Sequence, residues 1–277
     1  PRRCGRRPGS PRCRSPRPAA AGSGRVRHRP VPRTVAGSSA RPPDYIPGGG
    51  GGRGAGAGGG GGSAGAGGAA GSAGGGASAG GGAFLIGRDK VIGGSSSIAT
   101  QIQEPGVILH TGTMASMAFG EWDGEESARV VAFLDACKGA GINATMSDDI
   151  SEVIWSKFIF LSSFSGVTCR FRQSIGPIRE DAEKLAIYHQ ALEETFAVAI
   201  AKGVNLKTDL VEKRMAFTEG LPVEMYASMY HDLVNGRRLE LPWLSGAVVD
   251  LGRQLGIETP AHLDFTDALE PFVEGQT

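Results

Sequence analysis

The spacing of apolar residues changes near Asp149, and this change divides the chain into two kinds of predicted structure. After Asp149 the apolar positions recur every three or four residues, the period of a helix packed on one side. Gly203, Gly236 and Gly256 follow three of these stretches, and glycine favours the backbone conformation found just beyond a helix. We therefore expect an all-helical domain over residues 149–277. Its predicted helices cover 153–164, 185–200, 206–217, 223–234 and 243–255, and a last one begins at Thr259-Pro260, a cap followed by proline.

The segment before Asp149 has a different pattern. Residues 90–101 and 106–121 are rich in β-branched residues, glycine and serine, and Glu104-Pro105-Gly106 between them is a turn signal. These features predict a hairpin of two or three strands. A helix over 127–139 and a short strand over 142–146 follow. Residues 84–148 therefore read as the end of an α/β domain.

The first 83 residues are predicted to be disordered. Gly48–Gly82 consists almost entirely of glycine, alanine and serine, which bury little apolar surface and lose much entropy on ordering. A G-x-G-x-x-G match occurs at Gly54, Gly56 and Gly59. That motif binds a dinucleotide only between a strand and a helix. Neither is predicted there, so we attribute the match to chance.

Charge divides the chain in the same place. Residues 1–83 hold 13 Arg and one acid, about +12, whereas the remainder holds 16 Lys and Arg against 27 Asp and Glu, about −11. The Arg-rich head has three interpretations: it is a translation artefact or a fragment, an organellar targeting segment, or a nucleic-acid-binding arm. We favour the first and rank nucleic acid last. The acidic remainder argues against a nucleic-acid surface. The predicted location is the cytoplasm, or an organelle if the head is a targeting segment.

Cysteine and histidine spacing gives no sign of a metal site. Cys4, Cys13, Cys137 and Cys169 show no ligand spacing, which favours free thiols in a reducing compartment. The histidines beyond the head lie on separate predicted elements. No run of about 18 apolar residues occurs, so we predict no membrane span. Asp148-Asp149 before a helix reads as an N-terminal cap.

Two charged residues stand where apolar ones are expected. Lys157 occupies the apolar stripe of its helix: its stem either covers the core while the amine reaches water, or the amine is partly desolvated in a cleft. Desolvation would lower its pKa and fit it for proton transfer. Glu240, between Leu239 and Leu241, is either a solvated loop residue or a positioned hydrogen-bond acceptor.

Several ordered segments resemble ketopantoate reductases (2-dehydropantoate 2-reductases). Trp155-Ser-Lys157-Phe is similar to that family's W-x-K-[LF] segment, and residues 228–241 resemble its S-M-x-x-D-x-x-x-G-R-x-T-E-I-D signature. The resemblance covers residues 84–277. Further matching segments are Gly93-Gly94-Ser-Ser-Ser, residues 105–110, Phe119-Gly120-Glu121, Ala140-Gly141-Ile142, residues 147–150, Gly246, Gly252, residues 255–257 and Thr259-Pro260.

The resemblance implies a two-domain reductase that transfers hydride from NADPH to a small 2-keto acid. Its fold would be the C-terminal remnant of a Rossmann-type domain, then an all-α domain of the 6-phosphogluconate dehydrogenase C-terminal type. Lys157 would be the general acid and Glu240 would bind the substrate hydroxyl and reach the cofactor. Ser228 would hydrogen-bond the substrate, and Ser165 could do so. Thr100 would lie near the nicotinamide.

Departures from the family pattern qualify these expectations. Leu161 and Ser165 stand where asparagines are usual, and Leu239-Glu240-Leu241-Pro242 replaces T-E-I-D. The resemblance also leaves the first strand and the phosphate-binding turn without a counterpart in residues 1–83. Three hypotheses follow: a ketopantoate reductase compromised in cofactor binding, a non-catalytic relative that uses its helical domain to form a homodimer or bind a partner, or a reductase of another keto acid.

Overall fold

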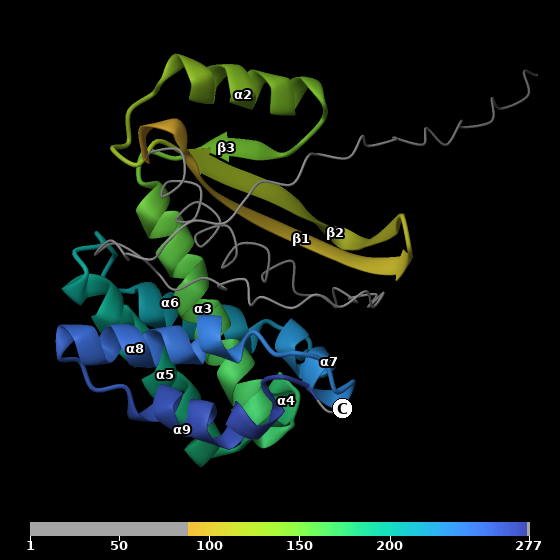
Figure 1. Cartoon of the computed structure of the whole chain (residues 1–277), viewed down its shortest axis with the longest axis vertical. Coiled ribbons are helices and arrows are strands. Elements are labelled where there is room, and N and C mark those ends of the chain that lie inside the picture. Colours follow the sequence, from red (N-terminus) through yellow and green to blue (C-terminus); the bar gives the residue numbers. More distant parts are fainter. Residues whose placement is uncertain (1–87, 276–277) are drawn as a thin grey trace, which may run out of the picture. The chain divides into compact units, whose positions relative to one another are not determined.

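The computed structural model describes residues 88–275, except for the side chains of residues 88, 99, 101, 102 and 111–113. The predictions for residues 1–83, including Gly54, Gly56, Gly59, Cys4 and Cys13, lie outside the described residues. The described chain is a small α/β part followed by a helical domain, which confirms the predicted fold class (Figure 1).

The α/β part is built on a long hairpin. Strands β1 (Gly93–Glu104) and β2 (Val107–Gly120) pair antiparallel, as the turn signal predicted, and Gly106 takes a left-handed backbone at the turn. The short strand β3 (Ala144–Met146) pairs parallel with the end of β2. Helix α2 (Ala128–Gly139) connects β2 to β3 and packs against β3. A single turn of 3-10 helix, Arg88–Lys90, precedes the hairpin.

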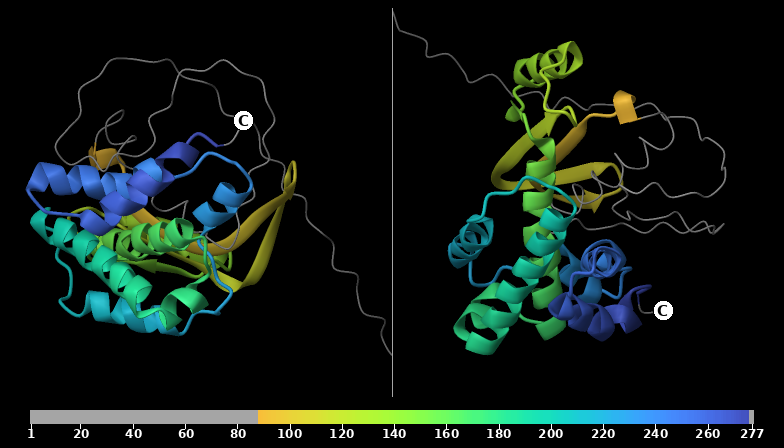
Figure 2. Two further views of the ribbon diagram at one scale, coloured as in Figure 1. Left: turned by 90° about the horizontal axis from the view of Figure 1, so that it is seen from below. Right: turned by 90° about the vertical axis from the view of Figure 1, so that its left-hand side faces the viewer.

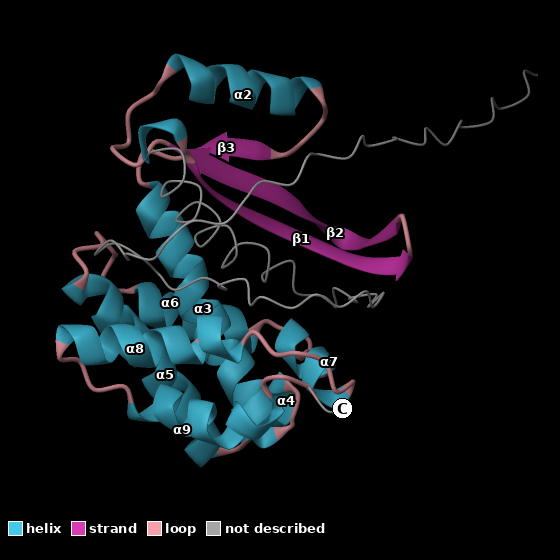
Figure 3. Cartoon of the chain, in the orientation of Figure 1, coloured by secondary structure: helices cyan, strands magenta, loops and turns pink. Residues whose placement is uncertain are grey.

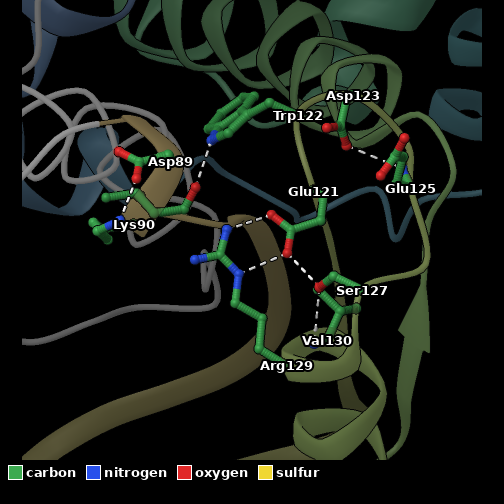
Figure 4. A network of polar contacts seen from close by, with 10 residues as sticks. Asp89, Lys90, Glu121, Trp122, Asp123, Glu125, Ser127, Arg129 and Val130 are labelled. Atoms are coloured by element: carbon green, nitrogen blue, oxygen red, sulfur yellow. Dashed lines mark hydrogen bonds and ion pairs between the residues drawn. The ribbon is translucent and has the colours of Figure 1, made fainter.

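A polar cluster fixes the start of α2 to the end of β2 (Figure 4). The Arg129 guanidinium donates two hydrogen bonds to the Glu121 carboxylate, at 2.7 and 2.5 Å. Ser127, the N-cap of α2, donates to the same carboxylate and accepts the Val130 N–H. Glu121 is buried, and its hydrogen bond with Arg129 holds the pKa of the carboxyl below its usual value.

Helix α3 (Ile150–Phe171) leads from the α/β part into the helical domain (Figure 2). Asp149 caps it by accepting the Glu152 N–H at 2.9 Å, as predicted. Nine consecutive residues, 161–169, are buried, because α3 packs against α5, α7, α8 and α9 as well as β1 and β2. At Gly166 any β-carbon would clash with the Phe265 ring, so glycine permits the close approach of α9.

Shorter helices surround α3 (Figure 3), and their cores merge into one apolar cluster. They are α4 (Ile175–Glu180), α5 (Ala182–Ala201), α6 (Leu210–Glu219), α7 (Ser228–Val234), α8 (Ser245–Leu255) and α9 (Pro260–Leu269), with 3-10 turns at Leu241–Trp243 and Glu270–Phe272.

The starts of α6 and α7 differ from the sequence prediction, and α4 was not predicted. α6 begins at Leu210, directly after Asp209, four residues later than predicted. α7 begins at Ser228 because the carbonyls of Val223 and Met225 accept the N–H groups of Gly176 and Ile175. Those bonds satisfy the first N–H groups of α4, which is six residues long. The apolar pattern did not predict this helix because its interior contains Gly-Pro. The backbone at Val223 and Met225 thus serves the start of α4, and the next helix begins only at Ser228.

Buried polar side chains join α9 to α5. The Glu194 carboxylate accepts the N–H groups of Ala261 and His262 at 2.8 and 3.0 Å, which satisfies donors at the start of α9. The fully buried His262 ring lies 2.8 Å from the Thr195 hydroxyl and 3.0 Å from the Ala191 carbonyl. Burial lowers the pKa of His262 to about 4.

We expect His262 to make the domain sensitive to acid. Its folded pKa lies below the unfolded value of about 6.5, so the unfolded chain binds the proton first. The free energy of unfolding should therefore fall as pH drops from about 6.5 towards 4, by about 2–3 kcal/mol at pH 4.5. Urea unfolding at pH 7 and 4.5 should show this loss in the native chain and less of it in His262→Gln.

His189, whose side chain is 41% exposed and pairs with Glu193 at 3.4 Å, offers a matched control. An acid loss reduced as much by His189→Gln as by His262→Gln would contradict this assignment.

Candidate active site

Lys157 links the helical domain to the hairpin. It lies on α3 between the buried residues Trp155 and Phe158, and its amine donates a hydrogen bond to the Ser96 carbonyl of β1. The side chain is half-buried. Burial is the cause that lowers the pKa of Lys157 to about 8. The amine is therefore a partly desolvated group, and it exchanges its proton close to neutral pH.

The position of Lys157 follows from the helix period. Ile154 and Leu161, three residues before and four residues after it, are both buried and mark the inward face of α3. A lysine on that face reaches the hairpin because β1 packs against α3. Of the two interpretations of this lysine, the structure favours the desolvated amine over the amine in water.

Glu240 is held in a loop between two buried leucines, Leu239 and Leu241. Its carbonyl accepts the N–H groups of Trp243 at 2.9 Å and Leu244 at 3.1 Å, so the residue begins the following 3-10 turn. The side chain is half-buried. Burial, and secondarily the nearby Asp232 carboxylate, raise the pKa of Glu240 to about 6. This carboxyl group can therefore carry a proton at mildly acidic pH.

Ser228 and Asp232 share one face of α7, since they are four residues apart. Both are half-buried. Arg237 approaches the Asp232 carboxylate at 3.7 Å, yet burial outweighs this pairing and raises the pKa of Asp232. Asp232 thus places a second carboxylate near Glu240. Asp232 lies within the signature of residues 228–241, but the sequence predicts no role for it. Its spacing of four residues from Ser228 is the signal that could have placed it beside the predicted site.

The remaining predicted site residues lie on the same elements as Lys157 and Ser96. Ser165 is two turns beyond Lys157 on α3 and only 3% exposed. Thr100 is half-buried on β1, opposite His110, next to an irregularity in the strand pairing after Ile98.

The structure joins these residues in two groups. In the first group, Lys157 contacts β1, the strand that also carries Thr100. The second group consists of Ser228, Asp232 and Glu240, which lie on α7 and the loop after it. The pKa shifts of Lys157 and Glu240 have separate causes, and neither depends on the charge of the other. The Ser96 carbonyl is a backbone group, so no sequence signal could have marked it.

Among residues 88–275, metal-binding and reactive-thiol sites lack their usual features. Within residues 88–275, no three His, Cys, Asp or Glu side chains gather as metal ligands would. Cys137 and Cys169 are buried free thiols, and burial raises the pKa of Cys169 to about 12. No helix in the same range has the length and apolar character needed to cross a bilayer.

Comparison with known proteins relates the helical domain to a known family. Residues 149–272 match the family model "Ketopantoate reductase PanE/ApbA C terminal". The chain is 32% identical over 175 residues to a 2-dehydropantoate 2-reductase of Mesorhizobium japonicum, covering 63% of this chain and 53% of that protein. It is 27% identical over 173 residues to the uncharacterized oxidoreductase YkpB of Bacillus subtilis, covering 62% and 57%.

A solved structure has a similar fold. The PanE/ApbA family ketopantoate reductase from Ralstonia eutropha JMP134 aligns with a TM-score of 0.58 at 26% identity, covering 66% of this chain and 59% of that one. The chain spans a little over half the length of these relatives. The fold and the matches define residues 149–272 as a reductase-type helical domain. Over these residues the chain is similar to the C-terminal domain of ketopantoate reductases.

We expect the Lys157 amine to titrate near pH 8, well below an ordinary lysine. Reductive methylation with ¹³C-formaldehyde, followed by NMR titration of the full chain, should show one dimethyl-lysine signal with this low pKa. The signal should be missing in Lys157→Arg and present in Lys138→Arg, which alters an exposed lysine on α2. A Lys157 signal that titrates near 10.5 would contradict the desolvated amine.

Proposed function

We propose that this protein reduces the carbonyl of a small 2-keto acid to a hydroxyl group, with Lys157 as the general acid. The half-buried Lys157 amine, held at the contact between α3 and β1, is the observation that carries the proposal. A carbonyl oxygen gains negative charge as its carbon is reduced, and a proton donor beside it lowers the barrier. A pKa near 8 leaves Lys157 mostly protonated at neutral pH, and it yields the proton more readily than an ordinary lysine.

Ser228 and Glu240 are proposed to bind the substrate. The Ser228 hydroxyl can donate to the substrate carboxylate. The Glu240 carboxylate, half-buried and unpaired with a cation among the described residues, can accept a hydrogen bond from a substrate hydroxyl. Burial makes such a bond selective, because a substrate without that hydroxyl would leave the carboxylate desolvated and unsatisfied.

The proposed reductant is a nicotinamide cofactor, NADPH by family resemblance, which supplies hydride when bound. The described residues fit only one end of it. Thr100 on β1 and Glu240 are the groups proposed to lie beside the nicotinamide. Within residues 88–275, no strand is followed by a glycine-rich turn and a helix N-terminus, the arrangement that holds dinucleotide phosphates. We therefore assign no residue here to the phosphates.

The substrate is proposed to differ from ketopantoate. Leu161 lies where the family usually has asparagine, and it is packed in the apolar core of the helical domain. It offers no hydrogen bond. Ser165, at the second such position, is almost completely buried. The two positions that usually carry asparagine are therefore apolar or buried here, which favours a keto acid other than ketopantoate.

If Lys157 is the general acid, Lys157→Ala should greatly lower kcat/KM for keto acid reduction. Steady-state reduction of ketopantoate and other 2-keto acids by the full chain, with NADPH and with NADH, should lose about 10²–10⁴-fold in kcat/KM because the proton donor is gone. Lys138→Ala serves as the control, and thermal unfolding should show that both variants remain folded. A loss below about tenfold would exclude Lys157 as the acid.

The same assay tests the protonation state of Lys157. The acid works only as an ammonium ion, so kcat/KM in the direction of reduction should be constant between about pH 6, where the proposed substrate-binding carboxylate of Glu240 becomes protonated, and pH 8. It should then fall about tenfold per pH unit above that value. A full chain that folds but neither binds NADPH nor reduces any keto acid would favour the non-catalytic alternative.

A further inference from the structure

We propose that the segment Phe272–Gly275 positions the Glu240 carboxylate by bracing residues 236–239, the backbone that leads into it. The inference rests on the proposed function only for the use made of Glu240. In Figure 1 this segment is the last described part of the chain, near α7. Residues 236–239 follow α7 directly, and Phe272 ends the last 3-10 turn.

A backbone hydrogen bond joins the two segments immediately before Glu240. The Leu239 N–H donates to the Val273 carbonyl at 2.8 Å, and Leu239 is fully buried. On its other side, the Glu240 carbonyl accepts the N–H groups of Trp243 and Leu244. The backbone of Glu240 is therefore fixed from both directions, and Val273 supplies the partner that is distant in sequence.

Close packing supports the same contact. Gly275 has a φ of 81°, in the left-handed region, and a β-carbon there would lie 2.5 Å from the Gly236 carbonyl oxygen and 3.1 Å from the Arg237 carbonyl carbon. Such a side chain would push directly on residues 236–237. The segment itself is held by two turns, in which the N–H groups of Val273 and Gly275 donate to the carbonyls of Glu270 and Phe272.

Surface charge contributes less to this contact. Arg238 approaches Glu274 at 3.6 Å, but their side chains are 55% and 78% exposed, and exposed ion pairs are weak. The Arg172 guanidinium lies 4.9 Å from the centre of the Phe272 ring, which anchors the start of the segment to the end of α3. We therefore assign the bracing to the backbone bond and to packing at Gly275.

Displacement of this loop should be visible at Glu240 itself. The raised pKa of Glu240 depends first on burial and then on Asp232, which faces Arg237 and His231. A loop pushed outwards would return the carboxyl group to water and move its pKa down. This readout needs neither cofactor nor substrate.

The test is NMR titration of the full chain labelled with ¹³C-carboxyl glutamate, with the Glu240 signal assigned by its loss in Glu240→Gln. Gly275→Ala should lower the pKa of Glu240 from about 6 by roughly one unit, towards the ordinary value. Gly203→Ala is the matched control: Gly203 has a φ of 82°, and no atom lies within 4 Å of a β-carbon there. Both variants carry the same backbone strain, but only Gly275→Ala pushes on the loop.

Two more variants complete the design. Glu274→Gln removes the ion pair and should leave the pKa of Glu240 unchanged. Phe272→Leu, which keeps an apolar side chain, should lower it by less than Gly275→Ala and provides the test if Gly275→Ala does not fold. An unchanged pKa in Gly275→Ala, or in Phe272→Leu if only that variant folds, would overturn the proposal. An equal shift in Gly203→Ala would do the same.

Kinetics separate this inference from the proposed function. Where the full chain reduces a keto acid, Gly275→Ala should raise KM more than it lowers kcat, and it should add no further loss in a Glu240→Gln background. An additive loss would overturn the proposal. A chain without reductase activity would refute the proposed function, while the titration would still decide whether Phe272–Gly275 positions Glu240.

Discussion

The partial burial of one amine, that of Lys157, is the constraint on which the site depends. A charged lysine costs free energy when it leaves water, and the Ser96 carbonyl compensates only in part. The amine responds with a pKa near 8. That pKa is a consequence of α3 packing against β1. The helical domain and the hairpin must therefore stay in contact for the Lys157 amine to keep its lowered pKa.

The helical domain keeps α3 in place by burying it on several sides. Nine consecutive residues in its second half, 161–169, have no exposed face, and Gly166 lets α9 approach closely. Buried polar groups then fix the neighbouring helices, with Glu194 completing the start of α9 and His262 bonded to α5. The acid sensitivity expected of His262 and the lowered pKa of Lys157 share one cause, because desolvation disfavours the charged form of each.

The carboxylates around α7 show the opposite effect of burial. Desolvation raises the pKa of both Asp232 and Glu240, and the charge of Asp232 adds to the rise at Glu240. Their loop is held by backbone contacts from a segment over thirty residues further along the chain. A binding carboxylate on a loop needs this kind of support, because a loop alone does not fix a side chain well enough for selective hydrogen bonding.

The apolar period by itself determined the helical domain and the inward place of Lys157, because burial on one side leaves a repeat that the sequence records. Composition and the turn signal at Glu104-Pro105-Gly106 indicated the hairpin. The family motifs indicated Glu240 and Ser228. Only the tertiary structure decided where α6 and α7 begin, since Val223 and Met225 cap α4. It also decided the partners of Lys157 and Leu239, which are the backbone carbonyls of Ser96 and Val273. Every residue has such a carbonyl, so only folding selects which one is used.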